Sequence, residues 1–123
     1  MATVNLDKAE FEKLVTTDNS FVLVDFWAEW CGPCRAFGPI YEKVSEKHPD
    51  ITFAKVDTDA EQELSAAAGI RSIPTLMMFR DGILLYNQAG AAPESTLEDL
   101  ITQARALDMD DVRKQIAEAN PVT

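Results

Sequence analysis

The stretch FVLVDFW, residues 21–27, constrains the fold more than any other part of this sequence. Six of its seven residues are apolar, and a near-continuous apolar run of this length is typical of a strand covered on both faces. Such strands occur mainly in sheets that have helices on either side, where neighbouring strands run parallel. The apolar spacing over residues 34–48 predicts a helix soon after the strand. The stretch therefore indicates an α/β protein.

Periodicity and turn residues predict the remaining elements. The expected order is a strand at 3–6, a helix from Asp7, the strand at 21–27, a helix at 34–48, a strand at 51–56, a helix at 60–68, a hairpin of strands at 75–80 and 83–88, and a helix from Ser95. Asp7 with Glu10, and Ser95 with Glu98, have the spacing of capping boxes. This order predicts a central mixed β-sheet, parallel in one half and an antiparallel hairpin in the other, flanked by helices.

Length and charge limit the classes of function. A chain of 123 residues suits one domain, which buries roughly two thirds of the surface of its unfolded chain. The net charge of −10 repels phosphate backbones, so nucleic acid is not an expected partner. No apolar run approaches the roughly 20 residues that span a bilayer, and the first residues lack the pattern of a signal peptide. We therefore expect a cytoplasmic protein with no membrane contact.

Both cysteines lie in one motif, Cys31-Gly32-Pro33-Cys34, and three uses of this pair compete. A structural disulfide across so short a loop would contribute only roughly 2 kcal/mol. A zinc site needs four ligands, and the single histidine, His48, is expected about 20 Å away along the helix, so no metal is expected. Reversible dithiol–disulfide exchange fits better, because the N-terminus of a helix favours a thiolate. On this interpretation Cys31 is exposed and nucleophilic, and Cys34 is shielded one turn inward.

Two further residues are candidates for the same site. Asp25 interrupts the apolar strand, and a buried carboxylate there would have a raised pKa and could exchange protons. Alternatively, Asp25 faces solvent or a lysine and only makes the strand more soluble. Pro74 in SIPT either follows a cis peptide bond or is an ordinary first residue of a strand. The Cys-x-x-Cys motif just beyond the strand favours the proton-exchange interpretation of Asp25.

These residues belong to a wider pattern. FVLVDFWAEWCGPC, AKVDTD, GIRSIPT and FRDG, in this order and at fitting spacing, resemble the thioredoxin family over roughly residues 3–107. The resemblance implies the thioredoxin fold and a protein-disulfide oxidoreductase that carries electrons. It implies that the attacking cysteine is Cys31, the resolving cysteine Cys34, the buried proton-exchanging carboxylate Asp25, the lysine beside it Lys55, and the cis-proline facing the disulfide Pro74.

The resemblance also implies a docking surface and partners. A flat apolar surface would receive target proteins, and its members besides Pro74 would be Trp30, Gly32, Pro33, Ile73, Gly90 and Ala91. Trp27 would pack behind the active site. No cofactor would be bound, because electrons would come from NADPH through a flavoprotein thioredoxin reductase. The other partners would be disulfide-containing target proteins, and a monomer is expected.

The chain continues past residue 107, near which members of the family commonly end. We therefore divide it into a thioredoxin domain, 1–107, and a C-terminal extension, 108–123. Asp108 predicts the cap of a separate helix that ends at Asn120-Pro121, although the extension could instead prolong the preceding helix. The apolar stripe of the separate helix would hold Met109, Val112 and Ile116. The extension is then either a solvated tail or a docking segment for a partner.

The function that the sequence favours is general protein-disulfide reduction through Cys31 and Cys34. One alternative is a non-catalytic interaction module, or a redox-linked chaperone, that uses the same apolar surface. Another is a thiol oxidase or isomerase. The Gly32-Pro33 pair between the cysteines and the missing export signal count against that last alternative.

Overall fold

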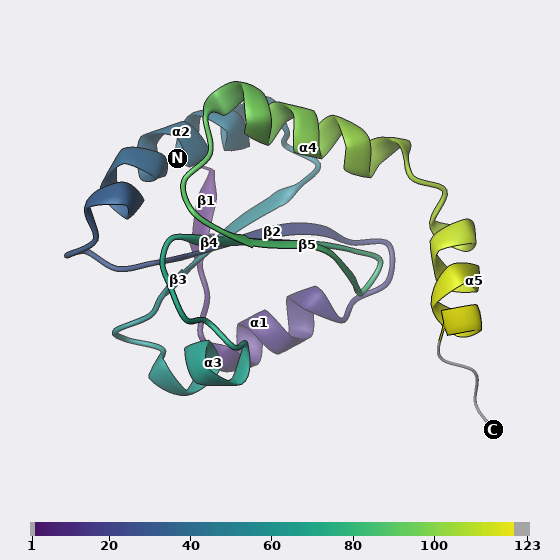
Figure 1. Ribbon diagram of the computed structural model, residues 1–123, viewed down its shortest axis with the longest axis horizontal. Coiled ribbons are helices and arrows are strands. Elements are labelled where there is room, and N and C mark those ends of the chain that lie inside the picture. The colour runs from purple at the N-terminus through teal and green to yellow at the C-terminus, as the bar shows by residue number, and fades with distance from the viewer. Residues whose placement is uncertain (1, 120–123) are drawn as a thin grey trace.

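The computed structural model describes residues 2–119 and contains one central sheet flanked by helices (Figure 1). In chain order its elements are β1 (Thr3–Asn5), α1 (Lys8–Val15), β2 (Phe21–Trp27), α2 (Gly32–Lys47), β3 (Thr52–Asp57), α3 (Gln62–Ala67), β4 (Thr75–Arg80), β5 (Ile83–Ala89), α4 (Glu94–Ala106) and α5 (Met109–Ala119). The strand order is β1-β3-β2-β4-β5. Helices α2 and α4 lie on one face of the sheet, and α1 and α3 lie on the other.

The sheet is parallel in one half and antiparallel in the other, as predicted. β3 pairs in parallel with both β1 and β2, while β2 pairs antiparallel with β4, which pairs antiparallel with β5. Strand β2 is therefore central and covered on both faces, which explains its continuous apolar sequence. Its one charged residue, Asp25, has Lys55 of β3 and Leu76 of β4 as register partners.

The antiparallel half forms because Asp81-Gly82 makes a tight turn. Asp81 has φ 53 and Gly82 has φ 79, the paired positive values of the turn that best joins two antiparallel strands. The backbone N–H of Asp81 donates to the carbonyl of Ser20 over 2.9 Å. A Cβ atom at Gly82 would lie 3.3 Å from the carbonyl oxygen of Thr16. The turn thus packs against the chain just after α1, and the predicted hairpin is confirmed.

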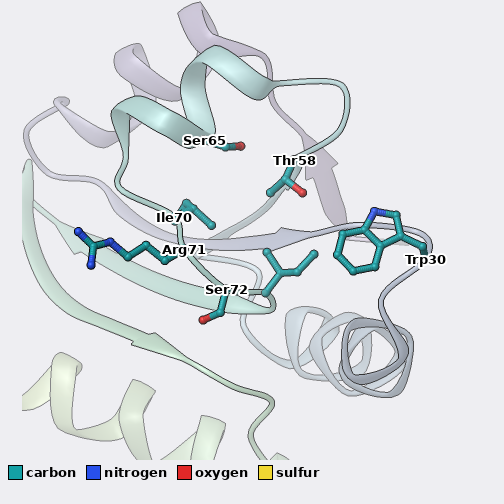
Figure 2. Close-up of a pocket in the computed structure, with 7 residues that line it drawn as sticks. Trp30, Thr58, Ser65, Ile70, Arg71 and Ser72 are labelled. Carbon is teal, nitrogen blue, oxygen red and sulfur yellow. The ribbon is translucent and has the colours of Figure 1, made fainter.

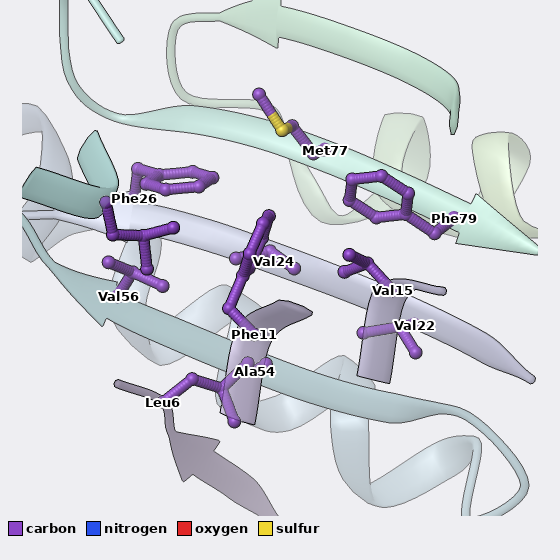
Figure 3. Packing of buried hydrophobic residues seen from close by; sticks show 11 residues of the cluster. Leu6, Phe11, Val15, Val22, Val24, Phe26, Ala54, Val56, Met77 and Phe79 are labelled. Carbon is purple, nitrogen blue, oxygen red and sulfur yellow. The ribbon is translucent and has the colours of Figure 1, made fainter. Parts of the chain in front are cut away.

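Alternating residues of the strands fill two cores, one on each face of the sheet. Figure 3 shows the core on the side of α1 and α3, where Phe11 packs edge-on against Phe26 and Phe79. The core on the other side joins α2 and α4 around Tyr41, whose hydroxyl donates to the carbonyl of Ala54 over 2.8 Å. Side chains on a strand point to opposite faces in turn, so one strand such as β2 supplies both cores.

The sequence predicts two capping boxes, and one of them forms. Asp7 accepts a hydrogen bond from the backbone N–H of Glu10, while the Glu10 side chain accepts from the N–H of Asp7. The box at Ser95 and Glu98 is wrong. Helix α4 begins at Glu94 with Pro93 as its N-cap, so Ser95 already lies inside the first turn. Glu98 instead pairs with His48 at the end of α2, 2.5 Å away.

The extension forms a helix of its own. Helix α4 ends at Ala106, and Asp108 caps α5 by accepting from the backbone N–H groups of Asp110 and Asp111 over 3.0 and 3.3 Å. The prediction that this helix prolongs α4 is therefore wrong. Arg80 stabilises the break, because its guanidinium donates to the carbonyls of Ala104 and Leu107 over 2.8 and 3.1 Å.

Helix α5 contacts the rest of the fold through its first turns. Met109 is buried, Val112 is half-buried and Ile116 is exposed, so burial of the predicted stripe decreases along the helix. Arg113 pairs with Asp81 of the hairpin turn, 3.5 Å away. The predicted stop at Asn120-Pro121 lies outside the described residues. A docking role for the extension stays a prediction.

Candidate functional site

The two cysteines form a disulfide where the chain passes from β2 into α2. Helix α2 begins at Gly32, two residues earlier than predicted, which makes Cys31 its N-cap. The Cys31 sulfur accepts a hydrogen bond from the backbone N–H of Cys34 over 3.2 Å. Pro33 lies in the first turn, where a missing N–H costs nothing. The sulfur of Cys31 thus lies at the positive end of the helix dipole, which stabilises a thiolate when the disulfide opens.

The expectation that Cys31 is exposed is wrong for this disulfide form. Cys31 is 4% exposed and Cys34 is 3% exposed. Ala28, Trp27 and Ile73 pack against the pair, and the Cys31 sulfur lies 3.6 Å from the carbonyl oxygen of Ile73. A loop more than 40 residues further along the chain therefore covers Cys31, which the local spacing could not reveal.

Asp25 is a fully buried carboxyl on the central strand. It is 0% exposed, and neither oxygen has a hydrogen-bond partner among the described residues. Burial raises the pKa of Asp25 to about 7, although the positive charge of Lys55 opposes the rise. A carboxyl with this pKa is present in both protonation states near neutral pH, as an acid–base group requires. The alternative that Asp25 faces solvent is wrong.

Lys55 and Trp27 connect Asp25 with the disulfide. The Lys55 ammonium lies 4.5 Å from the centre of the Trp27 ring, a cation–π contact. Trp27 also packs against Cys31 and Cys34. Trp27, Lys55 and Cys34 also line one surface groove of about 560 Å³, together with Arg35 and residues of β1 and α2.

The loop before β4 and the loop after β5 meet beside the disulfide. The Ile73–Pro74 peptide bond is cis, which the sequence alone left open. The Pro74 carbonyl accepts a hydrogen bond from the backbone N–H of Gly90 over 2.7 Å. Gly90 and Ala91 are exposed, while Ile73 is half-buried against the cysteines. The fold thus brings together residues that lie far apart in the sequence.

Trp30 is the most prominent exposed side chain near the disulfide. It is 70% exposed, and the neighbouring Gly32 and Pro33 are exposed as well. The indole N–H of Trp30 donates to the carboxylate of Asp59 over 3.0 Å. Asp59 belongs to the AKVDTD motif, but nothing in the sequence alone pairs it with Trp30. Only the fold brings the segment after β3 close to Trp30.

A second groove, of about 410 Å³, begins at Trp30 and runs along the segment between α3 and β4. Figure 2 shows the Trp30 ring at one end and the Arg71 side chain at the other. Between them lie Thr58, Ser65, Ile70, Ser72 and Ile73. The groove continues past the residues predicted for docking and adds Thr58, Ser65, Ile70, Arg71 and Ser72 to the surface near the disulfide.

The structure describes residues 2–119. In this part of the chain no group of three or more His, Cys, Asp or Glu side chains is placed to hold a metal ion. No helix within the same residues is long and apolar enough to cross a membrane.

Comparison with known proteins agrees with this geometry. The family model for thioredoxin matches residues 2–103. A protein described as a thioredoxin 2 of Streptomyces coelicolor is 59% identical over 117 residues, which are 95% of this chain and 87% of the relative. A thioredoxin of Mycoplasmoides gallisepticum is 45% identical over 95 residues, covering 77% of this chain and 94% of that protein.

Solved structures show the same arrangement. A mutant thioredoxin from Halobacterium salinarum superposes with a TM-score of 0.77 at 34% identity, covering 86% of this chain and 93% of that one. Fasciola hepatica thioredoxin gives a TM-score of 0.74 at 35% identity, covering 82% of this chain and 97% of that one. With the Cys31–Cys34 disulfide at the start of α2, these likenesses show that the chain belongs to the thioredoxin family of protein-disulfide oxidoreductases.

Proposed function

We propose that this oxidoreductase works as a general reductant of protein disulfides, with Cys31 as the attacking and Cys34 as the resolving thiol. The observation that carries the proposal is the closed pair at the N-terminus of α2. As N-cap, the Cys31 sulfur accepts a hydrogen bond from the backbone N–H of Cys34, and this position favours its thiolate. The exposed surface around Trp30 and the Pro74–Gly90 loops would hold the target protein over the pair.

In the first step the Cys31 thiolate attacks one sulfur of the target disulfide. The target S–S bond breaks, a bond forms between Cys31 and that sulfur, and the other target sulfur leaves as a thiolate that takes a proton. In the second step Cys34 gives up its proton and attacks the Cys31 sulfur. The Cys31–Cys34 disulfide forms, the target leaves as a dithiol, and two electrons have passed to it.

We assign Asp25 as the group that receives the Cys34 proton. Asp25 lies buried on the strand that leads into the motif, and its pKa of about 7 fits proton exchange in both directions. Lys55 would hold that pKa down, since its positive charge favours the ionised carboxylate. Without Lys55 the carboxyl would stay protonated at neutral pH and could not accept a proton.

The dithiol must be regenerated by another protein. We propose that a flavoprotein thioredoxin reductase, which draws electrons from NADPH, reduces the disulfide again. We also propose that this protein is a monomer and acts in the cytoplasm. Turnover with NADPH and a purified reductase from a bacterial relative tests the first part. Fractionation of cells that produce the protein tests the second.

The direct test is reduction of insulin, followed as turbidity, with dithiothreitol as the electron source. Wild type should accelerate precipitation well above the rate with Cys31→Ser. Cys34→Ser should instead accumulate a covalent complex with the target, because the second step is blocked. A wild type no faster than Cys31→Ser would refute the proposal, and a trapped complex in Cys31→Ser rather than in Cys34→Ser would reverse the two assignments.

A further inference from the structure

The groove between Trp30 and Arg71, called the channel from here on, lies beside the disulfide. Its wall nearest the cysteines contains Ile73, whose carbonyl oxygen lies 3.6 Å from the Cys31 sulfur. Its far end contains Arg71 (Figure 2). A target segment that presents its disulfide to Cys31 and continues along this channel would pass over Ile73 and Ser72 and reach the guanidinium.

Arg71 has no partner within the described residues. Most cations of this chain are engaged, since Lys8, Lys43, Lys47, Arg105 and Arg113 form ion pairs. Arg80 donates to helix carbonyls and Lys55 lies on the Trp27 ring. Arg71 is exposed and has neither kind of contact. An exposed guanidinium offers a fork of donors that matches a carboxylate.

This free cation stands out against the charge of the whole protein. At a net charge of −10 the molecule repels acidic polypeptides in general. Among the described residues three other exposed cations also lack an ion pair: Lys13, Arg35 and Lys114. Of these four cations only Arg71 lines the groove that begins at Trp30, so only Arg71 can attract a carboxylate there. The complementarity therefore concerns the position of a carboxylate in the target, and not the total charge of the target.

The target-binding surface proposed above extends into this channel, and we propose that Arg71 selects targets with a Glu or Asp at one fixed position from the attacked cysteine. The inference rests on the proposed reductase function and names a specificity residue for it. Arg71 touches the bound target, not the reacting sulfurs.

The test uses short peptides with a central cysteine linked by a disulfide to a small neutral thiol. Each position on either side of the cysteine carries Glu in one peptide and Gln in its match. Pre-reduced full-length protein is mixed with each peptide in a single turnover, and the second-order rate is divided by the rate with dithiothreitol. This division removes the effect of Glu on the intrinsic reactivity of the disulfide.

At one position, or two adjacent ones, Glu should react about fivefold faster than Gln, the size of a good exposed ion pair. The ratio should fall to about one in Arg71→Gln, persist in part in Arg71→Lys, and shrink at about 1 M salt, where the Debye length is about 3 Å. Lys114→Gln is the matched control, because it removes an exposed, equally unpaired cation from α5 at the far end of the molecule (Figure 1). It should leave the ratio at about fivefold.

A ratio of one or less at every position overturns the inference, as does a fivefold ratio that survives Arg71→Gln. Equal losses in Arg71→Gln and Lys114→Gln also overturn it, since net charge would then explain the effect. Circular dichroism of each variant checks that the fold is intact. If wild type reduces no peptide that dithiothreitol reduces, the proposed function itself fails, and this outcome is distinct from a missing preference.

Discussion

Replacing Asp25 by asparagine should make the oxidised protein more stable at neutral and alkaline pH. The side chain is fully buried and lacks hydrogen bonds to the described residues. In the unfolded chain its carboxyl ionises freely in water. In the folded protein the charged form is disfavoured, because the burial that raises its pKa outweighs the help of Lys55. Asparagine has nearly the same shape and never carries the charge.

The size of the effect follows from the pKa. Each pKa unit corresponds to about 1.4 kcal/mol, so a rise from 3.8 to about 7 corresponds to about 4 kcal/mol. The folded state binds the proton more tightly than the unfolded state, so this contribution to stability falls as pH increases. Below about pH 4 the carboxyl is protonated in both states and the contribution is absent. The loss develops between about pH 4 and pH 7 and is complete above.

The measurement is denaturant unfolding of oxidised wild type and Asp25→Asn across this pH range, followed by tryptophan fluorescence. The two free energies of unfolding should be similar near pH 4, and the variant should be more stable by about 3–4 kcal/mol near pH 8. A difference that does not change with pH, or a variant that is less stable at pH 8, would refute the reasoning. Lys55→Gln should destabilise the protein at pH 8 when Asp25 is present and much less in the Asp25→Asn background.

Three further substitutions test the scaffold by denaturant unfolding at neutral pH. Asp7→Ala removes the capping box of α1 and should cost about 1 kcal/mol; no loss would show that the box contributes nothing. Gly82→Ala should cost about 1–2 kcal/mol, since φ 79 disfavours a side chain and the new Cβ would lie 3.3 Å from the Thr16 carbonyl oxygen; a stabilised variant would contradict this. Tyr41→Phe removes the buried hydrogen bond to Ala54 and should cost about 1 kcal/mol without altering peptide reduction; an unchanged midpoint would mean that water replaces the hydroxyl.

Much of the fold follows from patterns within single segments. The central strand at 21–27, the Asp81-Gly82 turn and the Asp7 cap are each determined by neighbouring residues, and each forms as predicted. The Ser95 cap fails although its spacing is right, because the helix already begins at Glu94. The carbonyl of Pro93 accepts the first helical hydrogen bond, from the backbone N–H of Leu97. Spacing alone does not choose between two nearby starting points.

The site was less accessible to such reasoning where it depends on contacts between distant segments. Asp25 could be inferred, since a charge inside an apolar strand is visible in the sequence. Three features depend on how loops meet after folding. They are the burial of Cys31 by Ile73, the hydrogen bond from Trp30 to Asp59, and the groove that ends at Arg71. Hydrophobic periodicity within one segment carries no information about these contacts, so only the structure reveals them.

The position of α5 has a practical consequence. The helix sits at the pole of the molecule opposite the loop that carries the disulfide (Figure 1), and Arg80 and Arg113 secure this end to the hairpin. Cargo attached to an exposed side chain of α5, such as a dye, a surface linker or a second protein, would lie far from the reactive sulfurs. Helix α5 is therefore a suitable attachment site for immobilising or fusing the protein, because the surface around the disulfide stays accessible.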